Sequence, residues 1–276
     1  MSRDRRLTPA NGRVAALSLQ GQVEAARFVE GWTRFVAVPV VALRDAPQGR
    51  RERELLRGEA VTVFEDRDGW CFVQAARDGY VGYLPGEALH EGQAPDLRVR
   101  VRATHAYERA DIKSPDIVTL SFGSRLRHMG QEGRFILTDA GHVPAAHLAP
   151  VEMLEDDPVT VATLLLGTPY LWGGNSAFGI DCSGLVQAAC LACGIACPGD
   201  SDLQAAGLGA PVTSGSPPRR GDLLFWKGHV AWVSGPDMIL HANAHHMAVA
   251  FEGLAEAVAR IEAQGGGPVT GHRRPG

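Results

Sequence analysis

The sequence lacks the long apolar stretches that crossing a bilayer requires. No part of the 276 residues approaches the roughly 18 uninterrupted apolar residues of a membrane helix. The amino-terminal segment also lacks an apolar core behind its charged start, Met1-Ser-Arg-Asp-Arg-Arg6. We therefore expect no secretory signal and no membrane partner.

A strong charge imbalance is also absent. The chain carries 27 Lys and Arg against 31 Asp and Glu, a formal net charge of −4 at pH 7. A nucleic-acid partner usually requires a basic excess, so we expect none here. The hydrophobic fraction of 45% is enough to bury real cores, and the length favours more than one domain.

Cysteine is scarce and odd in number. Of the five cysteines, Cys190 and Cys193 form a CxxC spacing, but the second pair that a zinc site normally requires is missing. Both lie in an Ala, Leu and Val-rich helical pattern, where cysteine behaves as a small apolar residue. We interpret them as buried thiols, and we expect no metal and no cofactor. Free thiols without a secretory signal favour a reducing compartment, the cytoplasm.

The first half of the chain contains two similar segments of short strands separated by Gly and Asp turns. The first comprises the runs 55–61, 69–74 and 79–89, and the second the runs 120–126, 133–138 and 141–148. Each segment has the size of one small barrel and resembles the bacterial SH3-like barrel. We predict an amino-terminal arm at 1–32, all-β SH3-like barrels at 33–95 and 96–152, and a different domain at 153–276.

The second half of the chain changes in character. Its pattern predicts a helix over 157–166 with Pro158 in the first turn, a glycine-rich loop, a helix over 182–193 and a short helix from 201 to 206. Four strands are then expected, at 222–226, 230–234, 238–242 and 247–251. Helices followed by strands indicate an α+β domain.

Cys182 stands out as a candidate nucleophile. Asp181 is a good N-cap residue, so Cys182 is expected in the first turn of its helix. The positive end of the helix dipole lowers a thiol pKa from its usual value of about 8.5. A lone cysteine at a helix start is more often a packing residue, so the assignment depends on a partner base.

Two histidines can supply that base. His229 opens one predicted strand and His241 lies on the next, so antiparallel pairing can bring the two rings together. One ring then accepts the thiol proton while the other orients it. A lone histidine on a strand is more often structural. A metal site that uses His241, His245 and His246 has no HExxH or Cys/His pattern in its favour, so we expect none.

Six motifs in order carry a family resemblance. They are 170–174 (Tyr-Leu-Trp-Gly-Gly), 179–186 (Gly-Ile-Asp-Cys-Ser-Gly-Leu-Val), 198–204, 221–225, 229–232 and 241–242. Together they resemble the NlpC-type cell-wall peptidases, papain-like enzymes that cleave γ-D-glutamyl–diamino-acid bonds. The resemblance covers about 156–274. It implies an α+β papain-like catalytic domain preceded by the two small barrels.

The resemblance implies a role for each matching residue. Cys182 is then the nucleophile, His229 the base and His241 the orienting residue. Tyr170 matches a tyrosine whose hydroxyl joins the Cys182 N–H in an oxyanion hole. Four further positions match the substrate pocket: Trp172, Asp181, Ser183 and Ser201.

Two of these pocket positions have simpler explanations. Asp181 can serve only as the cap of its helix. Ser201 and Gln204 have the spacing of a capping box, which accounts for the serine without a ligand. One position departs from the family pattern, because Gly199 stands where arginine is common, and this leaves the finer substrate choice open.

Relatives with SH3-like barrels include recycling enzymes that require a free amino terminus. The resemblance implies that Tyr80 and Glu52, with Glu54 as a rival, bind the ammonium of L-Ala in the substrate. A buried ammonium–carboxylate pair rejects acylated peptides, since one charge would be left unpaired.

The leading hypothesis is a cysteine endopeptidase of murein peptide recycling. Its partner would be a peptide L-Ala-γ-D-Glu-diamino acid, with diaminopimelate and lysine both open. One alternative is a weakly catalytic or non-catalytic peptidoglycan-binding protein. Another is a secreted lysin that cuts intact wall.

Overall fold

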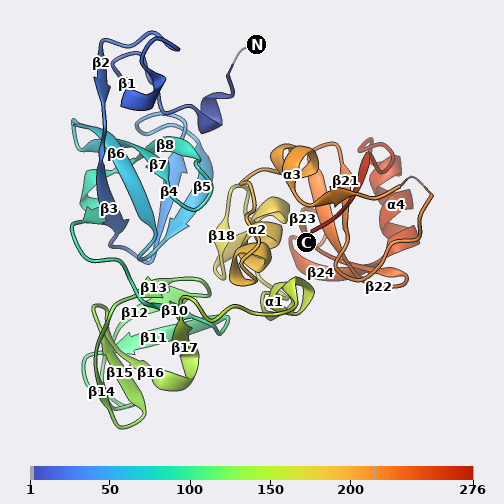
Figure 1. Cartoon of the computed structure of the whole chain (residues 1–276). Helices are drawn as coiled ribbons and strands as arrows, with labels where there is room; N and C mark the ends of the chain where they lie inside the picture. Colours follow the sequence, from blue (N-terminus) through green and yellow to red (C-terminus); the bar gives the residue numbers. More distant parts are fainter. Residues whose placement is uncertain (1–2, 214, 276) are drawn as a thin grey trace. The chain divides into compact units, whose positions relative to one another are not determined.

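The computed structural model describes residues 3–213 and 215–275. The chain divides into two compact units, Met1–Val151 and Glu152–Gly276 (Figure 1). Of the helices in the described part, none has the length and apolar character needed to cross a membrane.

The first unit begins with an arm that packs on a β module. The arm contains η1 (Arg5–Leu7), β1 (Val14–Ala16), η2 (Leu17–Leu19) and β2 (Arg27–Val29), and β1 pairs with β2 in parallel. Apolar side chains of the arm and of the module form one buried cluster: Val14, Ala16, Leu19, Phe64, Phe72 and Val81. Burial of these side chains holds the arm against the module.

The first β module is a seven-stranded antiparallel sheet with the order β5-β4-β8-β7-β6-β3-β9. Alternate residues of its strands point inward, as Val61 and Val63 do on β6, and this period-two pattern builds the core. Its elements are β3 (Trp32–Val36), β4 (Val40–Arg44), β5 (Arg51–Leu56), β6 (Ala60–Arg67), β7 (Trp70–Ala75), β8 (Val81–Pro85), η3 (Gly86–Ala88) and β9 (Leu89–His90).

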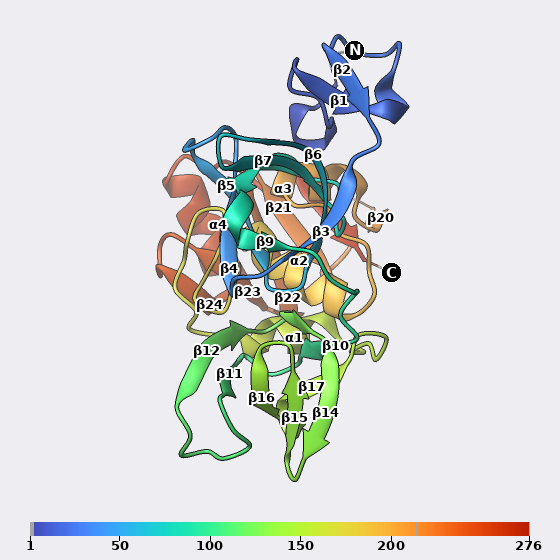
Figure 2. The same cartoon turned by 90° about the vertical axis from the view of Figure 1, so that its left-hand side faces the viewer.

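The second β module consists of two sheets, β13-β10-β17 and β12-β11-β16-β15-β14, and Figure 2 shows its hairpins β11–β12 and β14–β15. A core that includes Val99, Leu120, Leu126 and Val143 lies between them. The elements are β10 (Leu97–Val99), β11 (Ala103–Tyr107), β12 (Asp116–Ser121), β13 (Arg125–Leu126), β14 (His128–Glu132), β15 (Phe135–Thr138), β16 (Gly141–Pro144), η4 (Ala145–His147) and β17 (Leu148–Pro150).

The two modules end in the same local structure. In each, a strand ends at a proline, a single 3-10 turn follows, and a short strand completes the segment. Pro85 and Pro144 have nearly the same backbone angles, with φ −60 and ψ 132 against φ −53 and ψ 125. The next residue after each turn, Leu89 or Leu148, closes it with a backbone N–H bond. The similar segments seen in the sequence therefore fold alike at this point.

The second unit has a six-stranded antiparallel sheet with the order β20-β25-β21-β22-β23-β24. A separate short hairpin, β18–β19, precedes the helix that carries Cys182. The elements are α1 (Pro158–Leu164), β18 (Asn175–Ser176), β19 (Gly179–Ile180), α2 (Cys182–Ala192), α3 (Ser201–Gly207), β20 (Ala210–Pro211), β21 (Leu223–Trp226), β22 (His229–Gly235), β23 (Met238–Asn243), β24 (Ala248–Gly253), α4 (Leu254–Ala263) and β25 (Gly271–Arg274).

Helices cover both faces of this sheet (Figure 1). Leu224, Ala231 and Ile239 point to one face, where they pack against Ala257 and Ile261 of α4. The alternate residues of β21–β23 point to the other face, and there α2 contacts β22 and β23. The sheet is thus buried between layers, which holds its polar side chains in fixed positions.

Three helices and four strands lie close to their predicted positions, whereas α4, β20 and β25 were not predicted. The spacing of Leu254, Ala257, Val258 and Ile261 is that of an amphipathic helix and carried the information needed for α4.

Candidate active site

The start of α2 is held by the side chain of Asp181, the N-cap residue predicted from the sequence. Its Oδ1 accepts hydrogen bonds from the Gly184 N–H at 2.6 Å and the Ser183 hydroxyl at 3.0 Å, and its Oδ2 accepts the Gly173 N–H at 2.9 Å. Cys182 is therefore the first residue of the helix, and it is only 7% exposed. A thiol in this position feels the positive end of the helix dipole.

The glycine-rich loop packs tightly against this helix start. A Cβ at Gly184 would lie 2.4 Å from the Gly174 carbonyl oxygen, so only glycine permits the contact. In the same loop Tyr170 bridges to Ile180, and its N–H donates to the Met247 carbonyl at 2.9 Å. The loop therefore joins the segment before Cys182 to the start of β24.

Tyr170 remains a neutral hydroxyl donor at ordinary pH. Burial raises the pKa of its phenol well above the usual value, and the negative charges of Cys182 and Asp181 act in the same direction. The backbone bridge to Ile180, two residues before Cys182, places Tyr170 beside the segment that leads to the thiol. A protonated hydroxyl next to a thiol nucleophile has the character of an oxyanion-hole donor.

His229 and His241 lie together, as the predicted strand pairing requires. His229 Nε2 is 2.8 Å from His241 Nδ1, and His241 is completely buried. Burial lowers the pKa of His229 to about 3, helped by repulsion from His241 and Arg260. Burial likewise lowers the pKa of His241 to about 4, although Glu252 opposes the shift. Both imidazoles are therefore neutral near pH 7.

The histidine pair and the glycine-rich loop converge on one end of the sheet. The register that pairs Trp232 with Leu240 places His229 opposite Asn243, and Asn243 pairs with Ala248. Ala248 in turn bridges to Pro169, the neighbour of Tyr170. His229, the candidate base, and the loop that adjoins Cys182 therefore lie at the same end of the sheet.

Sequence reasoning missed the next partner of His241. His241 Nε2 lies 3.0 Å from Glu252 Oε2, and Arg260 of α4 binds both oxygens of this carboxylate, at 2.8 and 2.7 Å. Arg260 lowers the pKa of Glu252 to about 2. Glu252 pairs with Ile239, two residues before His241, so the alternation of the strand could have placed the acid on the face of the histidine.

The remaining predicted pocket positions lie around α2 and α3. Trp172 is 71% exposed, whereas Ser183 is buried against Asp181. The capping box at Ser201 was wrong, because Asp200 is the N-cap residue of α3. Gln204 instead donates to the Ser183 and Pro198 carbonyls, each at 3.0 Å, and ties α3 to α2.

In the first unit, Glu52 and Tyr80 lie near a guanidinium. Arg5 of the arm forms an ion pair with Glu52, and Glu52 and Tyr80 both raise the pKa of Arg5, Glu52 more strongly. Tyr80 is 2% exposed, and its N–H donates to Asp78 at 3.0 Å. The rival acid, Glu54, is buried and lies 3.4 Å from Arg51. A cationic group thus already sits where the resemblance places the substrate ammonium.

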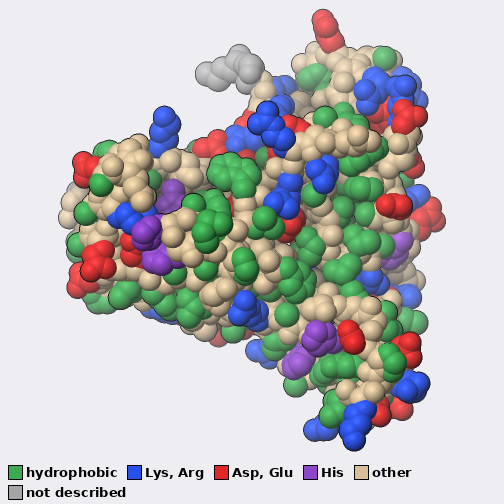
Figure 3. Space-filling model, turned by 180° about the vertical axis from the view of Figure 1, so that it is seen from behind, with side chains coloured by type: hydrophobic (Ala, Val, Ile, Leu, Met, Phe, Trp, Pro, Cys, Tyr) green, Lys and Arg blue, Asp and Glu red, His purple; other side chains and the backbone are tan. Residues whose placement is uncertain are grey.

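Among the described residues, side chains of the kinds that can bind a metal ion are grouped at one place. Atoms of His241, His246 and Glu252 lie within 4.8 Å of one another. However, Arg260 holds both oxygens of Glu252, so a cation would have to displace a guanidinium. The exposed rings of His245 and His246 stack edge to face at 4.8 Å, and histidines gather at the surface of this unit (Figure 3). We assign no metal to this group.

The cysteines are all free thiols. Cys190 is fully buried in α2 and Cys197 nearly so, whereas Cys193 is half-buried at the helix end. A hydrogen bond with Cys197, together with burial, raises the pKa of Cys190 far above the usual value. These thiols therefore behave as packing groups rather than nucleophiles.

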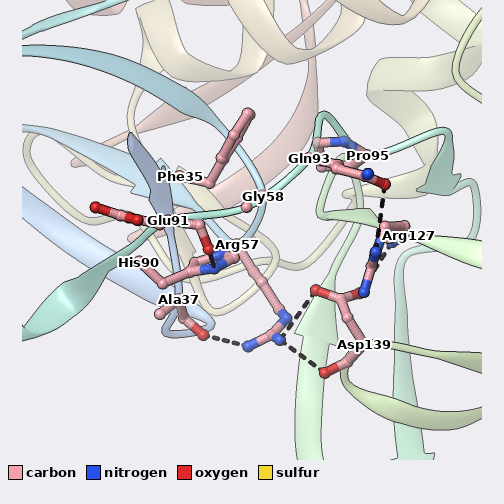
Figure 4. A pocket seen from close by; sticks show the side chains of 11 residues that line it. Phe35, Ala37, Arg57, Gly58, His90, Glu91, Gln93, Pro95, Arg127 and Asp139 are labelled. Atoms are coloured by element: carbon pink, nitrogen blue, oxygen red, sulfur yellow. Dashed lines mark hydrogen bonds and ion pairs between the residues drawn. The ribbon is translucent and has the colours of Figure 1, made fainter. Parts of the chain in front are cut away.

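A separate cavity of about 370 Å³ lies between the two β modules of the first unit (Figure 4). Arg57 reaches across it to the Asp139 carboxylate at 3.3 Å, and Arg127 donates to Gln93 at 3.3 Å. Arg57 also accepts the Arg125 N–H on its carbonyl at 2.8 Å. The polar groups of the cavity thus join the modules, and none of the predicted site residues lines it.

Two family descriptions match the chain. Residues 167–260 match the NlpC/P60 family, and residues 43–89 match the bacterial dipeptidyl-peptidase SH3 domain. The NlpC/P60 match contains Cys182, His229 and His241 as well as Tyr170.

Two relatives and one solved structure align with most of this chain. The chain is 29% identical over 234 residues to the γ-D-glutamyl-L-lysine dipeptidyl-peptidase of Bacillus subtilis, covering 75% of this chain and 77% of that protein. It is 27% identical to dipeptidyl-peptidase 6 of Lysinibacillus sphaericus, covering 69% and 79%. The structure of an NlpC/P60 family protein from Bacillus cereus has the same fold, with a TM-score of 0.74 and 21% identity over 88% of this chain and 99% of that chain. The chain therefore contains a domain of the NlpC/P60 family of cysteine peptidases, with a papain-like fold, and an SH3-like domain before it.

Proposed function

We propose that this enzyme hydrolyses the γ-D-Glu–L-diamino acid bond of murein stem peptides that carry a free amino-terminal L-Ala. The observation that carries the proposal is the hydrogen-bonded pair of neutral imidazoles, His229 and His241, at the sheet end reached by the loop beside Cys182. Relatives named as γ-D-glutamyl-L-lysine dipeptidyl-peptidases support this class of substrate.

Acylation begins with transfer of the Cys182 thiol proton to His229. The thiolate then attacks the side-chain carbonyl carbon of D-Glu, and the carbonyl oxygen becomes an oxyanion. The Cys182 N–H at the helix start and the Tyr170 hydroxyl donate hydrogen bonds to it. When the intermediate collapses, the C–N bond breaks and His229 returns the proton to the leaving amine of the diamino acid.

Deacylation uses the same groups in reverse. Neutral His229 accepts a proton from water, and the resulting hydroxide attacks the thioester carbonyl. Collapse breaks the C–S bond, releases L-Ala-D-Glu, and returns the proton to the Cys182 sulfur. No external oxidant or cofactor is required, because every proton and electron pair is balanced within the cycle.

We assign recognition of the L-Ala ammonium to Glu52 and Tyr80. The pairing of Glu52 with Arg5 supports this, because it shows that the carboxylate attracts a cation on the surface of the first unit. The substrate ammonium would replace the guanidinium of Arg5. Trp172, Asp181, Ser183 and Ser201 are proposed to line the pocket for the rest of the peptide.

The remaining proposals concern context. We infer that residues 96–152 form a second SH3-like barrel after the one at 33–95, which the matching strand–turn–strand ends at Pro85 and Pro144 support. We also propose that the enzyme acts in the cytoplasm on recycled peptides, a role that free thiols favour.

The test compares three substrates for the full chain: free L-Ala-γ-D-Glu-L-Lys and its diaminopimelate counterpart, the N-acetylated peptides, and whole sacculi. We expect cleavage of a free peptide to L-Ala-D-Glu, loss of turnover after acetylation, and none on sacculi. Cleavage of sacculi would instead indicate a lysin, and binding without turnover a wall-binding protein.

The mechanism is tested by the matched variants Cys182→Ala and Cys193→Ala. Cys182→Ala should abolish turnover, whereas Cys193→Ala, which changes a half-buried thiol at the other end of α2, should retain it. Iodoacetamide should inhibit and EDTA should not. Unchanged turnover in Cys182→Ala would refute the mechanism.

A further inference from the structure

Glu252 and Arg260 form a largely buried ion pair that contacts His241. Glu252 lies near the end of β24, and its side chain is 9% exposed. Arg260 lies two turns into α4, the helix that begins directly after this strand, and its side chain is 17% exposed. Because Ala257 and Ile261 pack α4 against the sheet, the position of Arg260 is fixed by the core.

The hydrogen bonds of this pair determine where protons reside. Arg260 donates two hydrogen bonds to Glu252, which keeps the group ionised, and an ionised carboxylate can only accept. The His241 Nε2 that faces Glu252 at 3.0 Å must therefore carry hydrogen. In a neutral imidazole the other nitrogen then has a free lone pair.

The same reasoning continues to His229. The lone pair on His241 Nδ1 faces His229 Nε2 at 2.8 Å, so His229 Nε2 must carry the hydrogen of that bond. The remaining nitrogen, His229 Nδ1, is left unprotonated. It is the one basic nitrogen in this series that is free to accept a proton from another group.

We propose that Glu252 and Arg260 are positioning residues that fix the tautomers of both histidines, so that Nδ1 of His229 is the base for the Cys182 thiol. The inference rests on the proposed function, since it assigns roles within that site. When the thiol proton reaches His229, the positive charge that forms is stabilised through His241 by the Glu252 carboxylate.

Replacing Glu252 with glutamine should move the hydrogen of each imidazole to its other ring nitrogen. In Glu252→Gln the amide oxygen keeps the bond from Arg260 Nε at the Oε1 position, and the NH2 group takes the Oε2 position, where it loses the bond from Arg260 Nη2 and donates toward His241 Nε2. His241 would then carry hydrogen on Nδ1 and donate to His229 Nε2. The hydrogen of His229 would then lie on Nδ1, the nitrogen that we assign as the base, and the base would be lost.

The experiment measures the rate of Cys182 alkylation by iodoacetamide against pH in the full chain, with Cys182→Ala as the blank for the other thiols. Loss of the hydrogen-bond partner of a metal-binding imidazole costs about 10–100-fold, and we take the lower end of this scale for His241. In Glu252→Gln we therefore expect a drop of about tenfold near pH 7 and a midpoint shifted to higher pH. The charged and titratable groups that act on the two histidines are Glu252 of β24, Arg260 of α4 and His246 of the loop after β23.

The control is Glu256→Gln, which makes the same chemical change at an exposed position of α4. It should leave the profile unchanged, and Glu252→Asp, which keeps a carboxylate, should restore most of it. ¹⁵N NMR of histidine-labelled protein should show hydrogen on Nε2 of both residues in the native chain and on Nδ1 in Glu252→Gln.

A native alkylation profile and native tautomers in Glu252→Gln, with only a lower melting temperature, would overturn the proposal. If that variant does not fold, Arg260→Gln serves instead: it should shift the profile in the same direction by a smaller amount, and no shift would count against the role of Arg260. Because alkylation needs no peptide, a wrong substrate assignment would appear as absent cleavage with these profiles intact.

Discussion

Glu59 in the first unit and Glu252 in the second are both carboxylates buried against an arginine, yet they connect to different groups. Arg77 binds both oxygens of Glu59 at 2.9 Å, and the second acceptor site of Glu59 takes the Leu56 N–H at 2.8 Å. Arg260 also binds both oxygens of Glu252, through Nε and Nη2, but the second acceptor site of Glu252 takes an imidazole. The Glu59–Arg77 pair is thus hydrogen-bonded to a backbone N–H, whereas the Glu252–Arg260 pair is hydrogen-bonded to a titratable imidazole.

This difference shows how the same ion pair serves two purposes. At Glu59 it satisfies a backbone N–H at the turn between β5 and β6, and Arg77 also donates to the Glu54 carbonyl. Its loss should therefore appear as lost stability. At Glu252 the pair holds hydrogen on a chosen ring nitrogen, so its loss should appear in reactivity. The contrast can be tested by perturbing each unit in turn.

The largest expected effect is on the imidazole that the second pair supports. His229→Ala should lower kcat/KM for L-Ala-γ-D-Glu-L-Lys by about 10²–10⁴-fold, the usual contribution of a general base. His245→Ala, which removes an exposed ring from the same unit, should keep kcat/KM within about twofold, since a surface position away from special features has little effect. Comparable activity in both variants would remove the distinction between the histidines.

Glu59→Gln should damage stability without changing catalysis. Breaking a buried ion pair on one side costs about 3–5 kcal/mol, and we expect the lower end of this range because Asp78, 3.5 Å from Arg77, still balances part of its charge. Urea unfolding of the full chain should show this loss, whereas kcat at a temperature where the protein is folded should be native. Glu87→Gln, an exposed change in the same module, is the control. A large fall in kcat with native stability would contradict the assigned structural role.

The positions of Cys182, His229 and His241 in the fold were predictable because their local causes lie in the sequence. Asp181 caps α2 and so fixes Cys182 at its first residue, and neighbouring antiparallel strands bring His229 and His241 together. Family and fold followed from the motifs around these residues. Local pattern carried this information because each feature depends on nearby residues or on one strand pairing.

The supporting ion pairs were not predictable in the same way. Glu252 lies one residue beyond the strand predicted at 247–251, and Arg260 lies in a helix that was not predicted. The capping box failed because Gln204 forms tertiary hydrogen bonds with Ser183 and Pro198 instead of a local one. Pairing of Arg5 with Glu52 likewise joins residues 47 positions apart. Such contacts depend on the completed fold.

The two units should also differ in how their stability changes at acidic pH. His229 and His241 have a pKa of about 6.5 in the unfolded chain and lower pKa values in the folded chain. Above pH 6.5 both states are unprotonated at these residues, so the histidines do not change the free energy of unfolding. Below pH 6.5 the unfolded chain binds protons that the folded chain does not, and stability falls. Stability of the second unit should fall from pH 6.5 toward pH 4 by a few kcal/mol. Glu252 and Asp222, with pKa values lowered to about 2, add a further loss below their ordinary values near 4.

The first unit should begin its loss at lower pH. Arg13 lowers the pKa of Glu65 from 4.5, so the stability from this pair is present above that value and declines below it. Changing Trp32 and Trp70 to Phe leaves tryptophans only in the second unit, and their fluorescence then reports its urea midpoint at each pH. A midpoint that stays constant from pH 7 to pH 5 would contradict the expected histidine effect.

The smallest expected effect concerns the exposed pair in the first unit. Arg5 is 64% exposed, so Arg5→Ala should change stability by less than about 1 kcal/mol. If Glu52 binds the substrate ammonium, removing its competitor should lower KM for the free peptide by about two- to fivefold, the range that such a pair permits, with kcat unchanged. Arg6→Ala is the control, because Arg6 pairs with Asp4 instead. A higher KM in Arg5→Ala alone would show that the guanidinium assists binding, and Glu52 would then act through Arg5 rather than on the ammonium.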